Sequence, residues 1–244
     1  MKAMILAAGL GTRLLPLTEH TPKALVKCNG VCLLEHAITS LKQANISEII
    51  INVHHFAQQI IDFLAQHQNF GFQIHISNES DNLLDSGGGV RHVLSRLSGS
   101  QPFLVWNVDV LSNISIPKML KTFHESENLA LLAVRQRSTS RYLLFDNENK
   151  LCGWENIKTK ECKLVQSSLH LKPLAFSGIQ ILHPDIFEHS KLRGVFSLTQ
   201  LYLELCQIHP IKAYRHDADY WFDLGTTEAI QRAETFLKSN SHLK

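Results

Sequence analysis

The sequence has no long apolar run and no marked surplus of one charge. Its hydrophobic stretches fall short of the roughly 18 residues that a membrane helix needs. The opening stretch MKAMILAA is short and is interrupted by Gly9, which argues against a secretory leader, so we expect a cytoplasmic protein without a membrane segment. Lysine and arginine number 24 against 22 acidic residues, and this balance offers no broad positive field for nucleic acid.

The cysteines are scattered, odd in number and without a CxxC pair, which is typical of reduced thiols rather than of a disulfide framework. They are Cys28, Cys32, Cys152, Cys162 and Cys206. With 244 residues, of which 44% are hydrophobic, the chain can bury one sizeable core. We therefore expect a single domain over residues 1–244 that acts on small molecules, as a monomer or a small homo-oligomer.

Short apolar runs alternate with segments of helical period in the first half of the chain. Strands are expected in MILA, EIIINV, FQIHIS and PFLVWNVD, and helices in LLEHAITSLKQA, FAQQIIDFLAQH and GGGVRHVLSRL. This alternation predicts an α/β fold with a Rossmann-like, doubly wound sheet. From about residue 130 consecutive strands follow, and helices return behind the cap residues Ser197 and Thr226. The sheet should therefore be mixed and carry a small β annex.

The first expected strand runs directly into the loop GLGTRLLPLTEHTPK. Gly9 and Gly11 permit positive φ angles and let backbone N–H groups approach a phosphate, while Arg13 and Lys23 add fixed positive charge. Leu14 stands where the dinucleotide motif GxGxxG and the phosphate loop GxxxxGK[ST] would each need a glycine, so neither motif accounts for the loop. For the loop alone, the alternative is an ordinary turn with charges that face solvent.

Two aspartates follow apolar strands later in the chain. Asp109 ends FLVWNVD and Asp223 ends DYWFD, and in α/β sheets ligands collect at the carboxyl ends of the strands. Mg²⁺ binds one or two carboxylates together with phosphate oxygens, so this pair and the basic glycine loop predict a Mg²⁺–nucleotide site. Taken singly, Asp109 also fits a turn, and Asp223 also fits a turn or a helix cap.

The opening stretch resembles the motif G-x-G-T-R-x(n)-P-K of the sugar-1-phosphate nucleotidyltransferases, or nucleoside-diphosphate-sugar pyrophosphorylases; here it reads AAGLGTRLLPLTEHTPKAL. Further segments similar to parts of that family are DSGGG (85–89), NVD (107–109), FSGIQIL (176–182) and WFDLGTTE (221–228). The short, repeat-free chain looks most like the N-acetylmuramate-1-phosphate uridylyltransferase branch. The resemblance implies a nucleotide-diphospho-sugar transferase fold that binds nucleotide with residues 1–130 and sugar with residues 131–244. It also implies a reaction, in which NTP and a sugar 1-phosphate give an NDP-sugar and pyrophosphate.

The resemblance also assigns roles to individual residues. Arg13, Lys23 and Asp109 would be catalytic, with Arg13 on the β- and γ-phosphates, Lys23 on the α-phosphate, and Asp109 and Asp223 holding Mg²⁺. The other nucleotide-binding residues would be Gly9, Gly11, Thr12, Ser86, Gly87 and Gly88, and the sugar-binding residues would be Asn107, Glu155, Ser177 and Gly178. A sugar phosphate has a second pKa of about 6 and is already an anionic nucleophile at pH 7, so the reaction needs alignment and charge neutralisation rather than a general base.

The sequence departs from the family on the sugar side. Where the family often has E-K-P, this chain reads GWENIK, with Glu155 kept and Asn156 in place of the lysine, and TSRYLLFD lacks a glycine often found in the preceding strand. The preferred substrates are UTP and N-acetylmuramate 1-phosphate, whose lactyl carboxylate Arg141 or Lys158 would meet. The alternative substrates are GTP with mannose or heptose 1-phosphate. The alternative classes of protein are a nucleotide-sugar sensor without turnover and a Rossmann oxidoreductase. The missing third glycine of the motif GxGxxG argues against the oxidoreductase.

Overall fold

The structure, a computed structural model, describes residues 1–240 except 43, 98, 100, 167 and 169. The chain divides into two compact units. Unit 1 comprises Met1–Leu83, Trp106–Asn113 and Tyr220–Lys244, and unit 2 comprises Leu84–Val105 and Ile114–Asp219. The chain leaves unit 1 and re-enters it twice, so each unit combines segments that are distant in the sequence.

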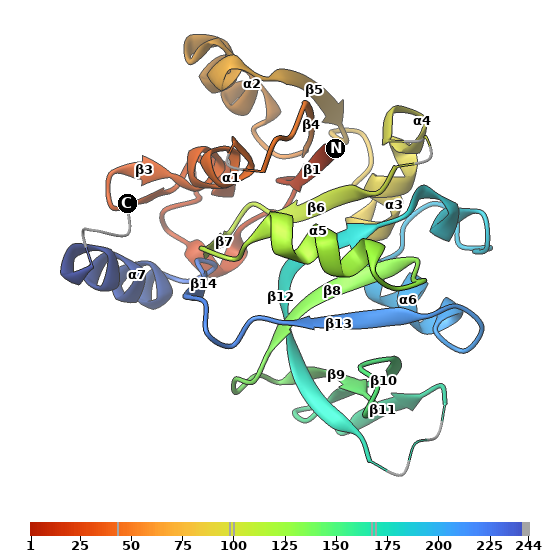
Figure 1. Cartoon of the computed structure of the whole chain (residues 1–244). Helices are drawn as coiled ribbons and strands as arrows, with labels where there is room; N and C mark the ends of the chain where they lie inside the picture. The colour runs from red at the N-terminus through yellow and green to blue at the C-terminus, as the bar shows by residue number, and fades with distance from the viewer. Residues whose placement is uncertain (43, 98, 100, 167, 169, 241–244) are drawn as a thin grey trace. The chain divides into compact units, whose positions relative to one another are not determined.

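Unit 1 is built on three parallel strands (Figure 1). They are β1 (Lys2–Leu6), β4 (Glu48–Val53) and β5 (Gln73–Asn78), and β4 pairs with both of the others. In the register Ile5 lies opposite Ile51, and both side chains are fully buried. The nearly continuous apolar runs of β1 and β4 are typical of buried parallel strands. The parallel order predicted from the alternating pattern is confirmed.

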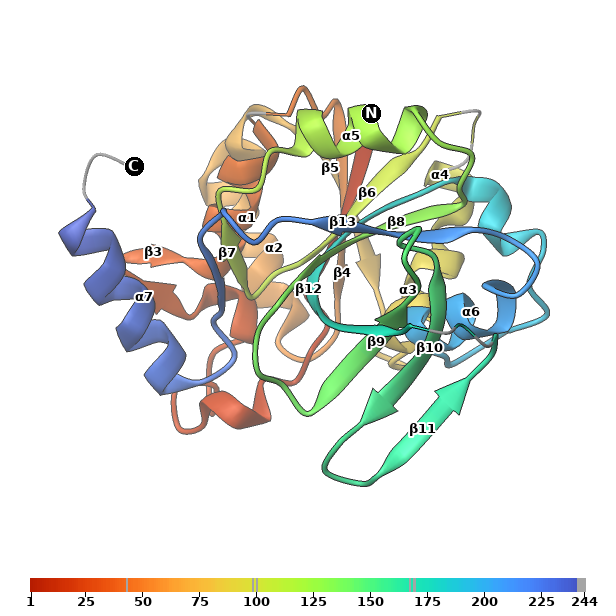
Figure 2. The ribbon, with the colours of Figure 1, turned by 60° about the horizontal axis from the view of Figure 1, so that its bottom comes forward.

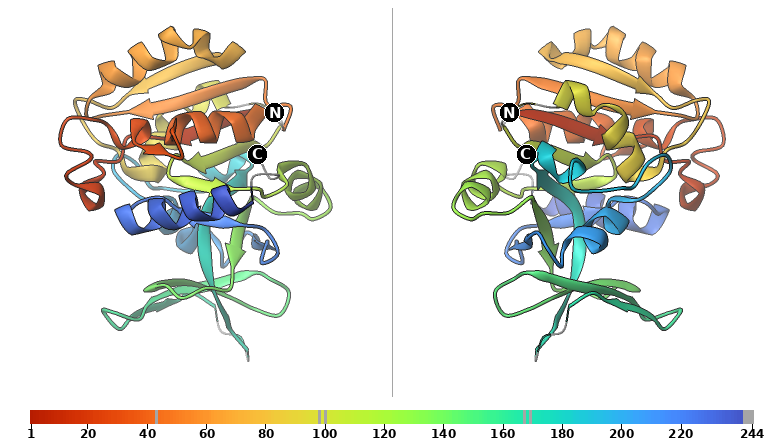
Figure 3. Two further views of the ribbon diagram at one scale, coloured as in Figure 1. Left: turned by 90° about the vertical axis from the view of Figure 1, so that its left-hand side faces the viewer. Right: turned by 90° about the vertical axis from the view of Figure 1, so that its right-hand side faces the viewer.

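Helices, turns and short ladders complete unit 1. Their bounds are α1 (Leu33–Lys42), α2 (Ala57–Gln66), α7 (Thr227–Ser239), the 3₁₀ turns η1 (Thr12–Leu14), η2 (Lys23–Leu25) and η3 (Gln68–Gly71), and the ladders of β2 (Lys27–Cys28) with β3 (Val31–Cys32) and of β7 (Val110–Ser112) with β14 (Trp221–Asp223). Helix α7, the blue helix of Figure 3, packs against β2 and β14. The hydroxyl of Thr226 accepts a hydrogen bond from the N–H of Ala229 at 3.3 Å, which confirms the predicted cap.

Unit 2 contains a mixed sheet. Its strands are β8 (Ala130–Arg135), β9 (Arg141–Phe145), β10 (Leu151–Asn156), β11 (Glu161–Leu164), β12 (Lys172–Leu182) and β13 (Ile211–Arg215). Strand β8 runs antiparallel to β12 and parallel to β13, while β9, β10 and β11 continue from β12 as antiparallel neighbours. Figure 2 shows β9, β10 and β11 as a small curled layer. The predicted α/β fold with a mixed sheet and a β annex is confirmed.

The helices of unit 2 are α3 (Asp85–His92), α4 (Leu94–Leu97), α5 (Ile116–His124), α6 (Leu198–Leu205) and the turn η4 (Pro184–Phe187). Helix α5 packs on β8 and β12, and α6 packs on α3 and β10. Ser197 and Gln200 form a reciprocal capping box at the start of α6, which confirms the predicted cap. Strand β6 (Phe103–Asn107) is divided between the two units, because unit 2 includes the chain up to Val105 and unit 1 resumes at Trp106.

Among the helices of the described chain, none has the length and apolar character needed to cross a bilayer.

Candidate active site

The four charged residues predicted to handle phosphate and metal all belong to unit 1. Arg13 lies on η1 and Lys23 begins η2, so both cations stand on short turns of the opening loop. The next residues along the chain, Leu14 and Ala24, are fully buried. Each turn is therefore anchored by an apolar side chain directly beside its cation, which limits the positions that the cation can reach.

The β7–β14 ladder brings Asp109 and Asp223 together. Asp109 directly precedes β7, and Asp223, the last residue of β14, lies opposite Val110 in the ladder. The N–H of Leu224 donates to the carbonyl oxygen of Asp109 at 2.8 Å, so the backbone is tied just beyond both acids. Two aspartates from distant parts of the sequence thus become neighbours across one short antiparallel pair.

Each aspartate has a cationic partner. Nζ of Lys23 contacts Oδ2 of Asp109, and these side chains expose only 14% and 13% of their area. Nη2 of Arg13 lies 3.7 Å from Oδ1 of Asp223, and these side chains are more open, with 60% and 42% exposed. The structure therefore gathers all four residues into one group, which we name the charged cluster: Arg13, Lys23, Asp109 and Asp223.

Burial and a neighbouring acid disfavour the ionised form of Asp223. Burial is the largest cause and the nearby charge of Asp109 is the second, and together they raise the pKa of the Asp223 carboxyl, while Arg13, the N–H of Gly225 and Lys23 oppose the rise. A divalent cation bound by the two carboxylates would favour the ionised form of Asp223 and so offset the effects of burial and of Asp109. The two carboxylates suit Mg²⁺ whose other ligands are phosphate oxygens and water. Within the described residues, no group of three or more histidine, cysteine, aspartate or glutamate side chains could hold a metal.

Gly11 is required by the packing of the opening loop. Its φ angle is 67°, and a methyl group there would lie 3.0 Å from side-chain carbons of both Thr18 and Lys23. The hydroxyl of Thr18 donates to the carbonyl oxygen of Gly11 at 2.9 Å and closes the loop on itself. Gly9 differs, because a methyl group placed there meets no atom of the described chain within 4 Å other than those of Gly9 and its two chain neighbours. Thr12, which follows Gly11, is exposed.

Gly225 is a site residue to which the sequence pattern assigned no role. A methyl group at this position would lie 2.7 Å from Oδ1 of Asp223 and would press on the guanidinium of Arg13. Its N–H donates to the same Oδ1 at 2.9 Å. Glycine therefore lets the arginine and the aspartate approach each other. The signal was present as the glycine two residues after the aspartate in WFDLGTTE.

The other predicted nucleotide-binding residues lie at the start of α3 in unit 2. The N–H groups of Gly87 and Gly88 donate to the carbonyl oxygen of Phe196 at 2.9 and 3.0 Å, and a methyl group on either glycine would collide with the segment that precedes α6. Oγ of Ser86 accepts from the N–H of Leu198 at 3.0 Å. Packing inside unit 2 thus accounts for the two glycines, and contacts of this segment with base and ribose stay a prediction.

The predicted sugar-binding residues come from three strands. Asn107 ends β6, Glu155 lies in β10, and Ser177 and Gly178 lie in β12 where its register with β8 shifts. The hydroxyl of Ser177 is fully buried and lies 2.6 Å from Nε2 of His216. The sugar-binding role of these four residues stays a prediction.

Asn156, which replaces the family's lysine, has a local structural role. It is buried, and its Oδ1 accepts from the N–H groups of Lys158 at 3.1 Å and Thr159 at 3.5 Å, which shapes the turn between β10 and β11. Arg141 lies opposite Asn156 in the β9–β10 ladder. Both cations proposed for the acceptor carboxylate, Arg141 and Lys158, therefore stand close to this turn and are exposed.

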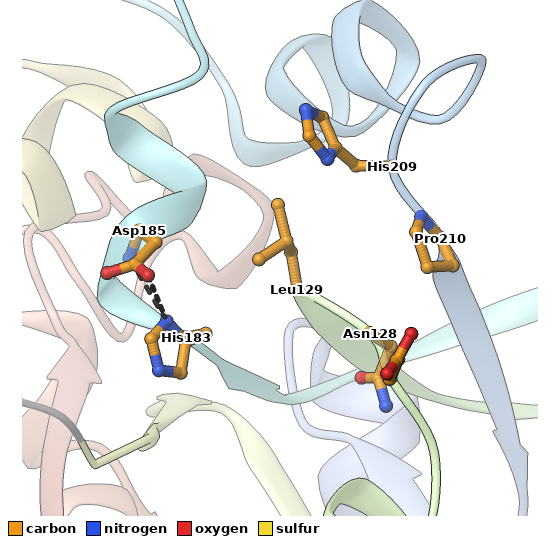
Figure 4. Close-up of a pocket in the computed structure, with 7 residues that line it drawn as sticks. Asn128, Leu129, His183, Asp185, His209 and Pro210 are labelled. Carbon is orange, nitrogen blue, oxygen red and sulfur yellow. Dashed lines mark hydrogen bonds and ion pairs between the residues drawn. The ribbon is translucent and has the colours of Figure 1, made fainter.

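A separate pocket of about 330 Å³ lies in unit 2 (Figure 4). Its lining residues are Glu127, Asn128, Leu129, His183, Asp185, His209 and Pro210. Nδ1 of His183 lies 3.3 Å from Oδ2 of Asp185, as the dashed line in Figure 4 marks. None of the residues predicted from the sequence to bind substrate lines this pocket.

Two cations on a glycine loop that follows a parallel strand, each paired with a carboxylate from another segment, define a class of α/β enzyme that handles phosphate. The family model described as nucleotidyl transferase matches residues 2–240. The chain belongs to this nucleotidyltransferase family.

The chain is 31% identical to the N-acetylmuramate alpha-1-phosphate uridylyltransferase of Neisseria meningitidis serogroup B, over 96% of this chain and 97% of the relative. It is 26% identical to the probable mannose-1-phosphate guanylyltransferase 1 of Oryza sativa subsp. japonica, over 92% of this chain and 61% of that protein. Among solved structures, a putative glucose-1-phosphate thymidylyltransferase from Bacillus anthracis matches with a TM-score of 0.78 and 22% identity, covering 97% of this chain and 94% of the other, which shows the shared fold. The predicted class of enzyme, a sugar-1-phosphate nucleotidyltransferase, is confirmed.

Proposed function

We propose that the protein transfers a uridylyl group from UTP to N-acetylmuramate 1-phosphate and releases pyrophosphate. The observation that carries the transfer reaction is the charged cluster, in which two cations and two carboxylates from separate segments meet beside the glycine loop. The choice of substrates is supported by the likeness to the Neisseria uridylyltransferase, which extends over nearly the whole of both chains.

The cluster suits a reaction between two anions. The phosphate oxygen of the acceptor must approach the α-phosphorus of UTP in line, and repulsion between them is the main barrier. Lys23, held in a largely buried position by Asp109, would contact the α-phosphate as charge develops there. Arg13 is more exposed, and its fork of donors would bind the β- and γ-phosphates and then the leaving pyrophosphate. Gly9 and Gly11 would offer backbone N–H groups to the nucleotide.

Asp109 and Asp223 would hold Mg²⁺, since their mutual repulsion and the partial burial of Asp223 favour a bound cation. When bound, the metal ion supplies charge neutralisation at the phosphate oxygens. Lys23 and Arg13 already contact these carboxylates, so phosphate and metal would take over contacts that the cations and acids now make with each other. The same residues therefore stay neutralised before and after substrate binding.

The acceptor of this proposal carries a carboxylate in addition to its phosphate. Arg141 and Lys158 near the β10–β11 turn would meet that carboxylate, with Glu155 of the same annex accepting hydrogen bonds from sugar hydroxyls. Because both cations are exposed, each would contribute a modest, salt-sensitive attraction.

Mannose or heptose 1-phosphate with GTP is the second candidate pair. The likeness to the rice guanylyltransferase favours it, and a neutral sugar would not require a cation at the position of Asn156. A sensor that binds nucleotide sugars without turnover is disfavoured, because it would not need the full set of paired charges.

A matrix of nucleoside triphosphates against sugar 1-phosphates, scored by pyrophosphate release in the presence of Mg²⁺, tests the proposal. Turnover with UTP and N-acetylmuramate 1-phosphate should exceed that of every other pair. Pyrophosphate release that depends on no sugar 1-phosphate in the panel would contradict the reaction itself.

A further inference from the structure

Unit 1 contains a buried chain of hydrogen bonds at the carboxyl ends of its three parallel strands. Asn52, in β4, and Glu79, just after β5, each expose only 3% of their area. Oδ1 of Asn52 accepts from the N–H of Ala7 at 2.8 Å, and Nδ2 of Asn52 donates to Oε1 of Glu79 at 2.9 Å. The N–H of Glu79 donates to the carbonyl oxygen of Val53 at 2.7 Å. The chain of bonds thus links the ends of β1, β4 and β5.

The chain of hydrogen bonds ends on the Leu6–Ala7 peptide group, which lies two residues before Gly9 begins the glycine loop. Ala7 lies one residue beyond the β1–β4 register, which ends with Leu6 opposite Asn52. The carbonyl oxygen of Leu6 accepts from the N–H of Val108 at 3.1 Å, while the N–H of Ala7 donates to Asn52. Both polar groups of the Leu6–Ala7 peptide are therefore held: the N–H by Asn52, and the carbonyl oxygen by Val108, which precedes Asp109. This plane sets the direction in which the backbone continues toward Gly9.

Glu79 and the N–H of Ala7 together fix which end of the Asn52 amide faces Ala7. An amide side chain has an accepting oxygen and a donating nitrogen of nearly the same shape, so its two orientations differ mainly through their partners. A carboxylate oxygen accepts and does not donate, so it selects the orientation that turns Nδ2 toward Glu79 and Oδ1 toward Ala7. A buried polar side chain is costly unless its hydrogen bonds are made, and here the bonds of Asn52 are made to the backbone of the loop entrance and to Glu79.

We propose that Asn52 and Glu79 are positioning residues, which hold the entrance of the glycine loop in the orientation that binds the triphosphate. Neither side chain contacts the nucleotide, and both act through the Leu6–Ala7 peptide. The inference rests on the proposed function, which assigns this loop to the phosphates of the donor. It predicts that nucleotide affinity depends on a matched donor and acceptor in the buried hydrogen bond between Asn52 and Glu79.

A reversal of that hydrogen bond tests the inference. Asn52→Asp keeps an acceptor for Ala7 but sets a second carboxylate oxygen against Glu79. Glu79→Gln keeps an acceptor for Asn52 but no longer selects the amide orientation. In the double variant, the amide introduced by Glu79→Gln can donate to the carboxylate introduced by Asn52→Asp, so donor and acceptor are both restored in reverse order. Asn78→Asp, at the exposed end of β5, is the matched control.

Calorimetric titration of full-length protein with UTP and with GTP, each with Mg²⁺, is the measurement, made well below the melting temperature of each variant. Asn52→Asp should weaken binding by about tenfold, the effect of roughly one net hydrogen bond. The double variant should recover most of this loss, and Asn78→Asp should bind like wild type. Glu79→Gln, the milder change, should weaken binding by about threefold, and it carries the test should Asn52→Asp fail to fold.

Two results would overturn the inference while the proposed function stands. In one, the single variants melt at lower temperature but titrate nucleotide as wild type does, which is the behaviour of residues with a purely structural role. In the other, the double variant binds no better than Asn52→Asp. Wild-type protein that binds neither nucleotide would instead overturn the proposed function, and the inference with it.

Discussion

Lys23 and Asp109 form a largely buried ion pair across 86 residues of sequence. Removal of either partner leaves the other charge in a place where water reaches it poorly, and this is costly. The ion pair therefore holds both side chains in the site, with their charges neutralised, before substrate binds. We expect the ammonium to turn to the α-phosphate, and the carboxylate to the metal, when nucleotide and Mg²⁺ arrive together.

The first prediction concerns Lys23. Since its charge is expected to meet charge that builds on the α-phosphate, Lys23→Ala should lower kcat more than it raises KM for the nucleotide. Steady-state kinetics with varied UTP makes the distinction. Lys27→Ala, which removes an exposed lysine of β2, is the control and should change neither constant appreciably. A change confined to KM would remove Lys23 from the chemical step.

The second prediction concerns the two aspartates. Asp109→Ala and Asp223→Ala should each reduce kcat by ~10²-fold or more, because bound metal stabilises charge at the phosphates by several kcal/mol. Circular dichroism should show that both variants stay folded. Asp81→Ala, at an exposed position of unit 1, should retain activity. Undiminished turnover of wild-type enzyme in excess EDTA would show that the reaction needs no metal.

The third prediction compares two glycines of the site. Gly225→Ala should push Arg13 away from Asp223 and reduce kcat/KM by roughly tenfold or more, since the added methyl group has no space there. Gly9→Ala meets open space, so its melting temperature should match that of wild type. Any loss of nucleotide affinity in Gly9→Ala would then report on the approach of phosphate to the backbone. Equal activity of Gly225→Ala and wild type would show that the Arg13–Asp223 contact is dispensable.

Much of the fold could be predicted from the sequence, because its strands and helices have strong periodic patterns. The run EIIINV is β4 to the residue, and the expected caps Ser197 and Thr226 begin α6 and α7. The short strands β2, β3, β7, β11 and β13 had no clear signal. All four side chains of β11 are exposed, for example, so no alternation of apolar and polar residues marks it.

The charged residues of the site could be predicted, but their pairing could not. Sequence spacing does not indicate that Lys23 meets Asp109 or that β7 pairs with β14, because both depend on contacts between distant segments. Asn52 and Glu79 were missed for a related reason. Asn52 lies within an apolar strand run, and only the fold shows that its amide faces Ala7.

The fourth prediction concerns pH and His216, which is buried in unit 2. The pKa of His216 is lowered to about 4, chiefly because burial disfavours the imidazolium, with Arg135 adding to the shift and Asp217 opposing it. An unfolded chain binds this proton at a pKa of about 6.5. The unfolded state therefore gains the proton first as pH falls from about 6.5 to about 4, and the free energy of unfolding declines over that range.

Urea unfolding of wild type and His216→Gln at pH 7 and pH 5 measures this contribution. Between these pH values wild type should lose about 2 kcal/mol more of its free energy of unfolding than the variant, in which the titrating group is absent. Glutamine can still hydrogen-bond to the hydroxyl of Ser177, so the comparison leaves that contact in place. Parallel pH profiles for the two proteins would mean that His216 titrates normally in the folded chain.

The measurement that tests the central claim most directly is kcat/KM for two donor–acceptor pairs on one enzyme preparation. UTP with N-acetylmuramate 1-phosphate should be the better pair, with release of pyrophosphate and a UDP-sugar identified by mass. A kcat/KM at least tenfold higher for GTP with mannose 1-phosphate, equal to about 1.4 kcal/mol of transition-state binding, would contradict the muramate assignment and leave the reaction class intact. Failure of both pairs, and of every other triphosphate and sugar 1-phosphate, to release pyrophosphate would contradict the account as a whole.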